Sequence, residues 1–118
     1  MAMLILRKSA LGNLGKHREA LAAFEEALRL NPNYAEAWDS RGAALSHLLQ
    51  YEQAITACEE AIKLKPSDVE AWNNKTWALF CLGRDTDALA SADQALRIAP
   101  NNIKAKSLRA RIEEKLRP

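Results

Sequence analysis

Adjacent carboxylates are the first residues in this 118-residue sequence that could do chemistry, because two carboxyl groups can act as general acid and base. Two such pairs occur, Glu25 with Glu26 and Glu59 with Glu60. A basic residue, Arg29 or Lys63, follows each pair at three or four positions. This is the spacing of weak ion pairs on a helix surface. We therefore interpret both pairs as parts of a solvent-facing surface.

Histidine and cysteine, which could bind a metal or act as a base or nucleophile, are few and isolated. His17 and His47 have no second ligand close by in the sequence. Cys58 and Cys81 lack the CxxC or Cys/His spacing of a zinc site. The four glycines are too scattered for a phosphate-binding loop. The sequence therefore predicts no enzyme, metal, cofactor or small-molecule substrate, and its isolated thiols favour a reducing compartment, the cytoplasm.

The charge balance does not require an anionic partner. The 17 Lys and Arg residues are interspersed among 15 Asp and Glu residues, whereas nucleic-acid-binding domains concentrate basic residues on one face. A basic row does recur at one fixed interval, at Arg7, Arg41, Lys75 and Arg109. This row makes RNA binding one hypothesis for the function. However, no aromatic residues are interleaved with it, and glutamates one helix away could neutralise its charge. The opening segment is a poor signal peptide, and no segment is apolar enough to span a membrane.

An internal repeat with a period of about 34 residues organises the chain. Five columns keep one residue type at this interval: Pro32, Pro66 and Pro100; Leu11, Leu45 and Leu79; Leu14, Leu48 and Leu82; Ala20, Ala54 and Ala88; Ala27, Ala61 and Ala95. Within each unit, apolar residues recur at three and four positions in two runs separated by a short break. Each unit is therefore predicted to be a helical hairpin.

Seven helices are expected, at about 2–14, 18–30, 34–48, 52–64, 68–82, 86–98 and 102–116. Gly15 and Gly83 stand where the first helix of a hairpin would end in a left-handed residue, a conformation that glycine adopts at no steric cost. Leu49 holds this place in the middle unit. The middle turn must therefore have a different backbone conformation from the glycine turns, or Leu49 must carry strain of about 1 kcal/mol.

Capping residues are expected just after the prolines. Asn33 with Glu36, and Ser67 with Glu70, have the spacing of a capping box, in which side chains satisfy the first free amides of a helix. Asn101 would cap the last helix without such a partner. We therefore attribute the two glutamates to capping rather than to ligand binding.

The repeat resembles the tetratricopeptide repeat family in its period and in its order of Trp, small residue, Leu, Ala, Ala and Pro. The middle unit carries the match through Trp38, Gly42, Leu45, Tyr51, Ala54, Ala61 and Pro66. Some residues depart from the pattern without breaking the helical period: Lys8 replaces the small residue, Cys58 and Ala92 replace the aromatic held by Phe24, and Arg7, Arg41 and Lys75 replace an apolar residue. The resemblance implies an all-α, right-handed superhelical solenoid of antiparallel helix pairs, as one domain over residues 1–118. Its repeats would span about 1–34, 35–68 and 69–102, followed by a capping helix at about 103–116.

Two tryptophans of the third unit must lie on different faces of one helix. Trp72 repeats Trp38 and belongs to the core stripe, while Trp77 has no counterpart and lies roughly 140° from Trp72 around the axis. In the resembling family, the first helices of the hairpins line a concave groove. We expect Trp77 to face this groove; the alternative is that it fills a gap against the capping helix or Ala43.

The resemblance further implies a non-catalytic interaction or scaffold module that binds a peptide or helix of a partner protein in this groove. The expected partner-binding residues are Trp77, Phe80, Asn73, Asp39, Ala43, Ser46, His47, Lys104 and Arg111. Trp77 and Phe80 would form a hydrophobic anchor, and the polar residues would add specificity. A subclass of the family clamps the C-terminal carboxylate of chaperones with Lys, Asn and Arg. This chain has Ile5, Ser9, Glu70 and Asn74 at those positions, so the clamp is absent.

The apolar start of the chain motivates a second hypothesis. Met3, Leu4, Ile5 and Leu6 include residues that could lack a partner within the first hairpin. The first helix would then mediate self-association into a homo-oligomer, or the chain would continue a longer repeat array.

Overall fold

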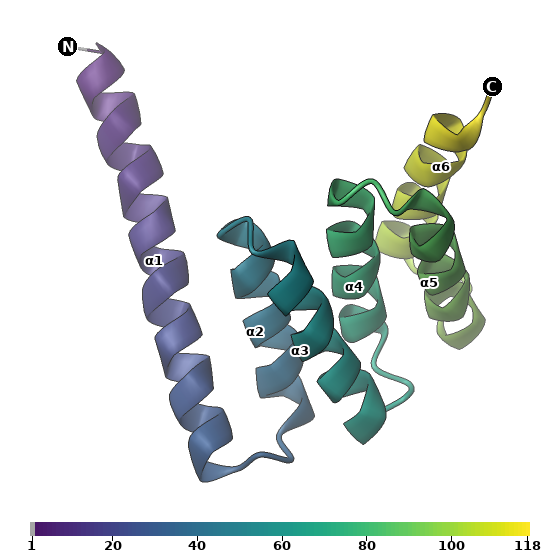
Figure 1. Ribbon diagram of the computed structural model, residues 1–118, viewed down its shortest axis with the longest axis horizontal. Helices are drawn as coiled ribbons and strands as arrows, with labels where there is room; N and C mark the ends of the chain where they lie inside the picture. Colours follow the sequence, from purple (N-terminus) through teal and green to yellow (C-terminus); the bar gives the residue numbers. More distant parts are fainter. Residues whose placement is uncertain (1) are drawn as a thin grey trace.

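The computed structural model describes the backbone of residues 2–118 and the side chains of residues 14–118. Residues 2–118 form six helices and no strand, which confirms the predicted all-α solenoid (Figure 1). The helices are α1 (Ala2–Leu30), α2 (Ala35–His47), α3 (Tyr51–Leu64), α4 (Val69–Cys81), α5 (Asp85–Ile98) and α6 (Ile103–Leu116). Two antiparallel hairpins, α2 with α3 and α4 with α5, pack in succession, and α6 packs against α4 and α5.

One helix replaces the two that were expected in the first unit. Helix α1 runs without a break through Gly15, so the predicted left-handed turn at Gly15 is wrong. The middle hairpin shows what such a turn requires: a Cβ added to Gly42 would lie 2.6 Å from Cys58 Sγ. The first unit has Lys8 and Phe24 in these two columns. Lys8 would therefore bring a long side chain to the closest approach of a hairpin, which disfavours folding the chain back.

The turns of the other two hairpins share one backbone conformation. Leu49 has φ +64° and Gly83 has φ +80°, so both residues are left-handed. Equivalent hydrogen bonds close the turns, because the Gln50 amide donates to the Leu45 carbonyl at 2.8 Å and the Arg84 amide to the Leu79 carbonyl at 2.9 Å. Of the two alternatives for the middle turn, the structure therefore shows the left-handed one, in which leucine carries strain of about 1 kcal/mol.

The predicted helix caps are wrong by one residue. Asp68 Oδ1, rather than Ser67, accepts the Ala71 amide at the start of α4, and Asn102, rather than Asn101, accepts the Ala105 amide at the start of α6. The first residue after each proline belongs to the turn that precedes the helix, so the cap moves one position along the chain. At the start of α2 the capping position is held by Tyr34, and no side chain of Asn33 or Tyr34 caps the helix. Glu36 and Glu70 therefore form no capping box and remain exposed carboxylates.

The core runs through the middle of the described hairpins and is built largely of alanine. Ala54 and Ala88 are fully buried, and Leu45 and Leu79 are 1% and 2% exposed. Trp38 and Trp72 extend this repeating pattern, because their indole nitrogens donate to the carbonyls of Pro32 and Pro66 at 2.9 and 3.0 Å. Trp72 is therefore part of the repeating scaffold, as the sequence predicts.

The strained turn gives a direct test of this account. Replacing Leu49 with glycine should stabilise the fold by about 0.5–1 kcal/mol, because glycine adopts a positive φ without a steric penalty. The exchange loses little packing, since Leu49 is 71% exposed. The measurement is the free energy of unfolding in urea. As the matched control, Gly83→Ala should lower the stability by a similar amount; a destabilised Leu49→Gly variant would contradict the account.

Candidate functional site

A hollow lies where the first helices of the units meet the terminal helix. Its volume is about 210 Å³, and it is lined by Ala43, Ser46 and His47 of α2, Asn74 and Trp77 of α4, and Lys104 of α6. Five of the nine residues that the sequence nominates for partner binding are therefore brought together, all except Phe80, Asn73, Asp39 and Arg111. We refer to this space as the Trp77 hollow.

Trp77 has an aromatic neighbour and a cation that lies over both rings. Its ring centroid lies 6.0 Å from that of Phe80, and the planes are tilted by 37°. The Arg111 guanidinium of α6 lies 5.6 Å from the centroids of both rings, and the Lys115 ammonium lies 4.9 Å from that of Phe80. Trp77 is half-buried, so it both packs toward α6 and keeps part of its surface toward the hollow. Phe80 packs against the core.

Two polar residues of α4 have roles that differ from those predicted. Asn73 is completely buried, and its amide nitrogen donates to Asn102 Oδ1 at 3.2 Å. It therefore ties α4 to the start of α6 instead of facing a ligand. Asn74, which the sequence marks only as a departure from the carboxylate clamp, lines the Trp77 hollow and donates to the Asp39 carbonyl at 3.2 Å.

Ser46 supplies a polar group without a partner at the wall of the hollow. It is 7% exposed, and among the described residues nothing hydrogen-bonds its Oγ. A buried hydroxyl without a partner costs about 1–3 kcal/mol. Ser46 thus reduces stability at the same place where Trp77 leaves apolar surface open.

The two histidines meet at the edge of the hollow. The His17 ring of α1 stacks on the His47 ring of α2 with centroids 4.1 Å apart and planes 6° apart. Burial lowers the pKa of His47, and the charges of His17 and Lys104 lower it further. His47 is therefore neutral at pH 7, able to donate one hydrogen bond and accept another.

Asp39 lies in a second hollow, near the start of α2 and α4. Its volume is about 460 Å³, and it is lined by Glu36, Asp39, Ser40, Lys65, Ser67, Asp68, Val69 and Glu70. Burial raises the pKa of Asp39 to about 8, helped by a hydrogen bond to Asp68 and by the negative charges of Asp68, Glu70 and Glu36. Asp39 therefore holds a proton at neutral pH and donates it toward Asp68, and it does not line the Trp77 hollow.

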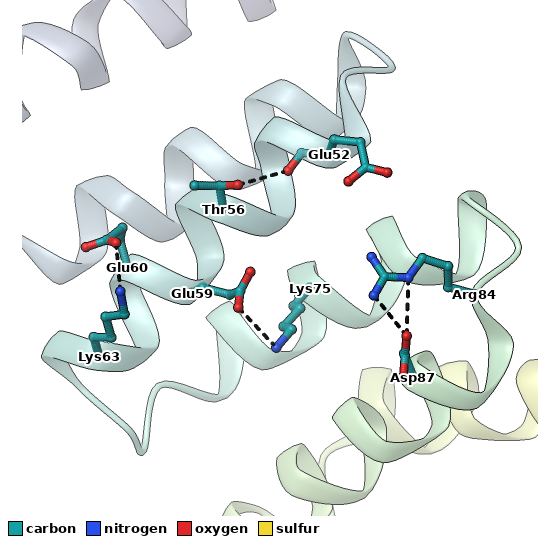
Figure 2. Close-up of polar contacts among 8 residues, drawn as sticks. All are labelled: Glu52, Thr56, Glu59, Glu60, Lys63, Lys75, Arg84 and Asp87. Atoms are coloured by element: carbon teal, nitrogen blue, oxygen red, sulfur yellow. Dashed lines mark hydrogen bonds and ion pairs between the residues drawn. The ribbon is translucent and has the colours of Figure 1, made fainter.

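The basic row is neutralised by acids of the preceding helix. Glu25 pairs with Arg41 at 3.7 Å, Glu59 with Lys75 at 4.0 Å and Asp93 with Arg109 at 2.6 Å, and both sets recur at the repeat interval. Figure 2 shows the middle pair together with the surface pair Glu60–Lys63, which confirms the interpretation of the adjacent glutamates. Arg41, Lys75 and Arg109 are therefore each already paired with an acidic residue of the same chain. The side chain of its first member, Arg7, lies outside the described residues.

The described residues were also compared with the requirements of a metal site, a membrane-spanning helix and a disulfide. No group of three or more His, Cys, Asp or Glu side chains is placed there to hold a metal ion. None of the described helices is both long and apolar enough to cross a bilayer. Cys58 and Cys81 are not joined to each other in a disulfide; Cys58 is buried and Cys81 exposed.

Comparison with known families fits this geometry. A family model described as "Tetratricopeptide repeat" matches residues 48–103, and one described as "TPR repeat" matches residues 10–48. The chain belongs to the tetratricopeptide repeat family. A search of curated protein sequences gives no match.

Solved structures of tetratricopeptide repeat domains share the fold. The first such domain of Spaghetti (RPAP3), bound to the HSP90 peptide SRMEEVD, is 23% identical with a TM-score of 0.83, over 96% of this chain and 91% of that one. The Arabidopsis OM64 domain is 27% identical with a TM-score of 0.84, over 92% and 89%. The TPR2B domain of yeast Sti1 in its pHsp70 complex is 24% identical with a TM-score of 0.81, over 92% and 90%.

The residues at the carboxylate-clamp positions remain a departure within this family. Glu70 is an exposed acid beside the Asp39 hollow, and Asn74 is engaged with the Asp39 carbonyl. The side chains of Ile5 and Ser9 lie outside the described residues. A negative charge at Glu70 would repel a terminal carboxylate rather than bind it.

The protonated Asp39 predicts a stability that depends on pH in a definite direction. Its pKa is raised from 3.8 to about 8 on folding, so the native state binds the extra proton and loses stability as pH rises through this window. Asp39 of the second unit corresponds to Asn73 of the third, so Asp39→Asn introduces the residue that the next unit carries at the same position. It should raise the free energy of unfolding at pH 8 by about 1 kcal/mol, a figure reduced for partial solvent exposure, and change it little at pH 4.

The measurement is urea unfolding of the wild type and variant between pH 4 and 8. Glu52→Gln is the control, because it removes an exposed acid on α3 that lies outside the cluster around Asp39. An Asp39→Asn variant with the wild-type pH slope would contradict the assignment.

Proposed function

We propose that the chain is a non-catalytic scaffold module that binds a peptide or helix of a partner protein in the Trp77 hollow. The observation that carries this proposal is the convergence of residues from α2, α4 and α6 on one hollow beside a half-buried tryptophan. Half-buried aromatic side chains in a concave site are the residues that most often anchor a partner. Ion pairs in the basic row count against RNA as the ligand.

The lining of the hollow defines the ligand that fits. An apolar side chain would pack against Trp77 and Ala43, while Ser46, Asn74 and His47 offer hydrogen-bonding groups around it. Lys104 places a positive charge at the rim. Peptides bound by the related domains of RPAP3 and Sti1 support a peptide ligand for this chain. The absent clamp makes an internal segment, rather than a chain end, the better ligand.

The setting of the proposed interaction is the cytoplasm. Cys58 and Cys81 are free thiols in the structure, and proteins of reducing compartments keep their cysteines in this form. The module would act as one domain and need neither metal nor cofactor for the contacts described above.

Selection from a peptide library tests this function. Trp77→Ala should weaken binding of the selected peptides about thirtyfold, the loss expected for an aromatic anchor worth about 2 kcal/mol. The measurement is the dissociation constant by fluorescence anisotropy. Leu30→Ala is the matched control, because Leu30 is an apolar side chain, 71% exposed, at the end of α1 and outside the hollow.

Both variants should unfold at temperatures close to that of the wild type, which separates a lost contact from a lost fold. If Trp77→Ala folds normally and binds every selected peptide as the wild type does, the hollow is not the binding site. If no peptide is selected by any of the proteins, the proposed function itself fails.

A further inference from the structure

The charge of the Trp77 hollow differs from that of the Asp39 hollow. Of the six described residues that line the Trp77 hollow, none is acidic, and Lys104 is the one that is charged when His47 is neutral. The Asp39 hollow, in contrast, has four acidic residues and one basic residue. Within the part of the chain whose side chains are described, Lys104 forms no ion pair. The Trp77 hollow therefore has a positive charge that no acid of its own wall balances.

Helix α6 adds to this positive charge. Its first turn, which contains Lys104, has no acidic residue, whereas the first turns of α2, α3, α4 and α5 each have one or more. The start of a helix carries a partial positive charge from its free amides. Arg111, seven residues and therefore about two turns after Lys104, places its guanidinium over the Trp77 ring. An anionic group would thus be attracted to this side of α6.

The Ser46 hydroxyl is a buried donor without an acceptor at the same hollow. Ser46 is 7% exposed, and its Oγ has no hydrogen-bond partner among the described residues. A ligand that accepts a hydrogen bond from Ser46 would remove the cost of leaving this group unpaired. A carboxylate has two oxygens that accept hydrogen bonds, so it suits one hydroxyl and one ammonium at the same time.

We propose that the Trp77 hollow selects its partner segment by an acidic side chain, whose carboxylate accepts hydrogen bonds from Lys104 and Ser46. An apolar side chain beside that acid packs on Trp77. This inference rests on the proposed function and adds a charge requirement to it. The single ammonium in the wall matches the single charge of a carboxylate. Because the acid is a side chain within the segment, its recognition does not need the carboxylate clamp that the chain lacks.

Paired peptides test the charge requirement. The probe is an array of peptides with both ends blocked, so that no terminal carboxylate is present. We expect the peptides that bind the wild type at pH 7 to contain Asp or Glu close to an apolar residue. Replacing this acid by its amide should weaken binding to the wild type about tenfold, measured by fluorescence anisotropy, because a hydrogen-bonded charge is lost.

Lysine variants locate the charge that the acid meets. In Lys104→Gln the acid and amide forms of each peptide should bind within about twofold of each other, since the two partners of one interaction are coupled. Lys106→Gln is the matched control, because Lys106 is an exposed lysine on the same helix that does not line the hollow. This control should keep the tenfold preference for the acid.

Serine variants separate a binding role of Ser46 from a structural one. Ser46→Ala should weaken binding of the acidic peptides about tenfold without lowering the unfolding temperature, because the hydroxyl that it removes has no partner in the free protein. Ser91→Ala is the matched control: Ser91 is 3% exposed, its Oγ also lacks a partner, and it lies on α5 outside the hollow. It should leave peptide binding unchanged. A Ser46→Ala variant that is less stable and binds acid and amide peptides equally weakly would contradict the assignment.

The outcomes separate this proposal from the proposed function. If peptides bind through Trp77 but the wild type does not distinguish acid from amide, the charge requirement is wrong and the proposed function stands. The same conclusion follows if Lys104→Gln and Lys106→Gln keep an equal preference for the acid. If no peptide binds the wild type, the proposed function and the charge requirement fail together.

Discussion

The close approach of two helices within each hairpin is the constraint on which the rest of this structure depends. Gly42 lies where any side chain would collide with Cys58, and fully buried alanines recur along the second helices. Small residues bring the helices near enough for the left-handed turns at Leu49 and Gly83 to join them. Where Lys8 takes the place of the small residue, the hairpin is replaced by one long helix.

The same constraint positions the candidate site. Because each hairpin is tight, α2 can lie beside α4, and α4 beside α6. Trp77 can then face residues of α2 and α6 at once, and the buried Asn73–Asn102 hydrogen bond holds α6 against α4. The terminal helix is thus more than a solvated cover for the last repeat, because Lys104 and Arg111 complete the surroundings of the tryptophan.

Sequence periodicity predicted the features that depend on repetition and missed those that depend on a single position. The five columns gave the helix pairs of the second and third units, and the repeat of Trp38 gave the place of Trp72. The break at Gly15 was mispredicted, because the glycine signal is local, whereas the bulk of Lys8 matters only against a helix that lies farther along the sequence. Asn73 was expected at the surface because helical geometry fixes its direction but does not show that Asn102 covers it. The pairing of Asp39 with Asp68 joins two units, and no spacing within one unit could indicate it.

The ion pairs between units have a mechanical consequence. Each pair joins the second helix of one unit to the first helix of the next, across the interface about which successive units rotate. All three are partly exposed to solvent, so dissolved salt weakens them while the buried alanines hold each hairpin together. Raising the ionic strength should therefore weaken the contact between successive units more than the contact within a hairpin.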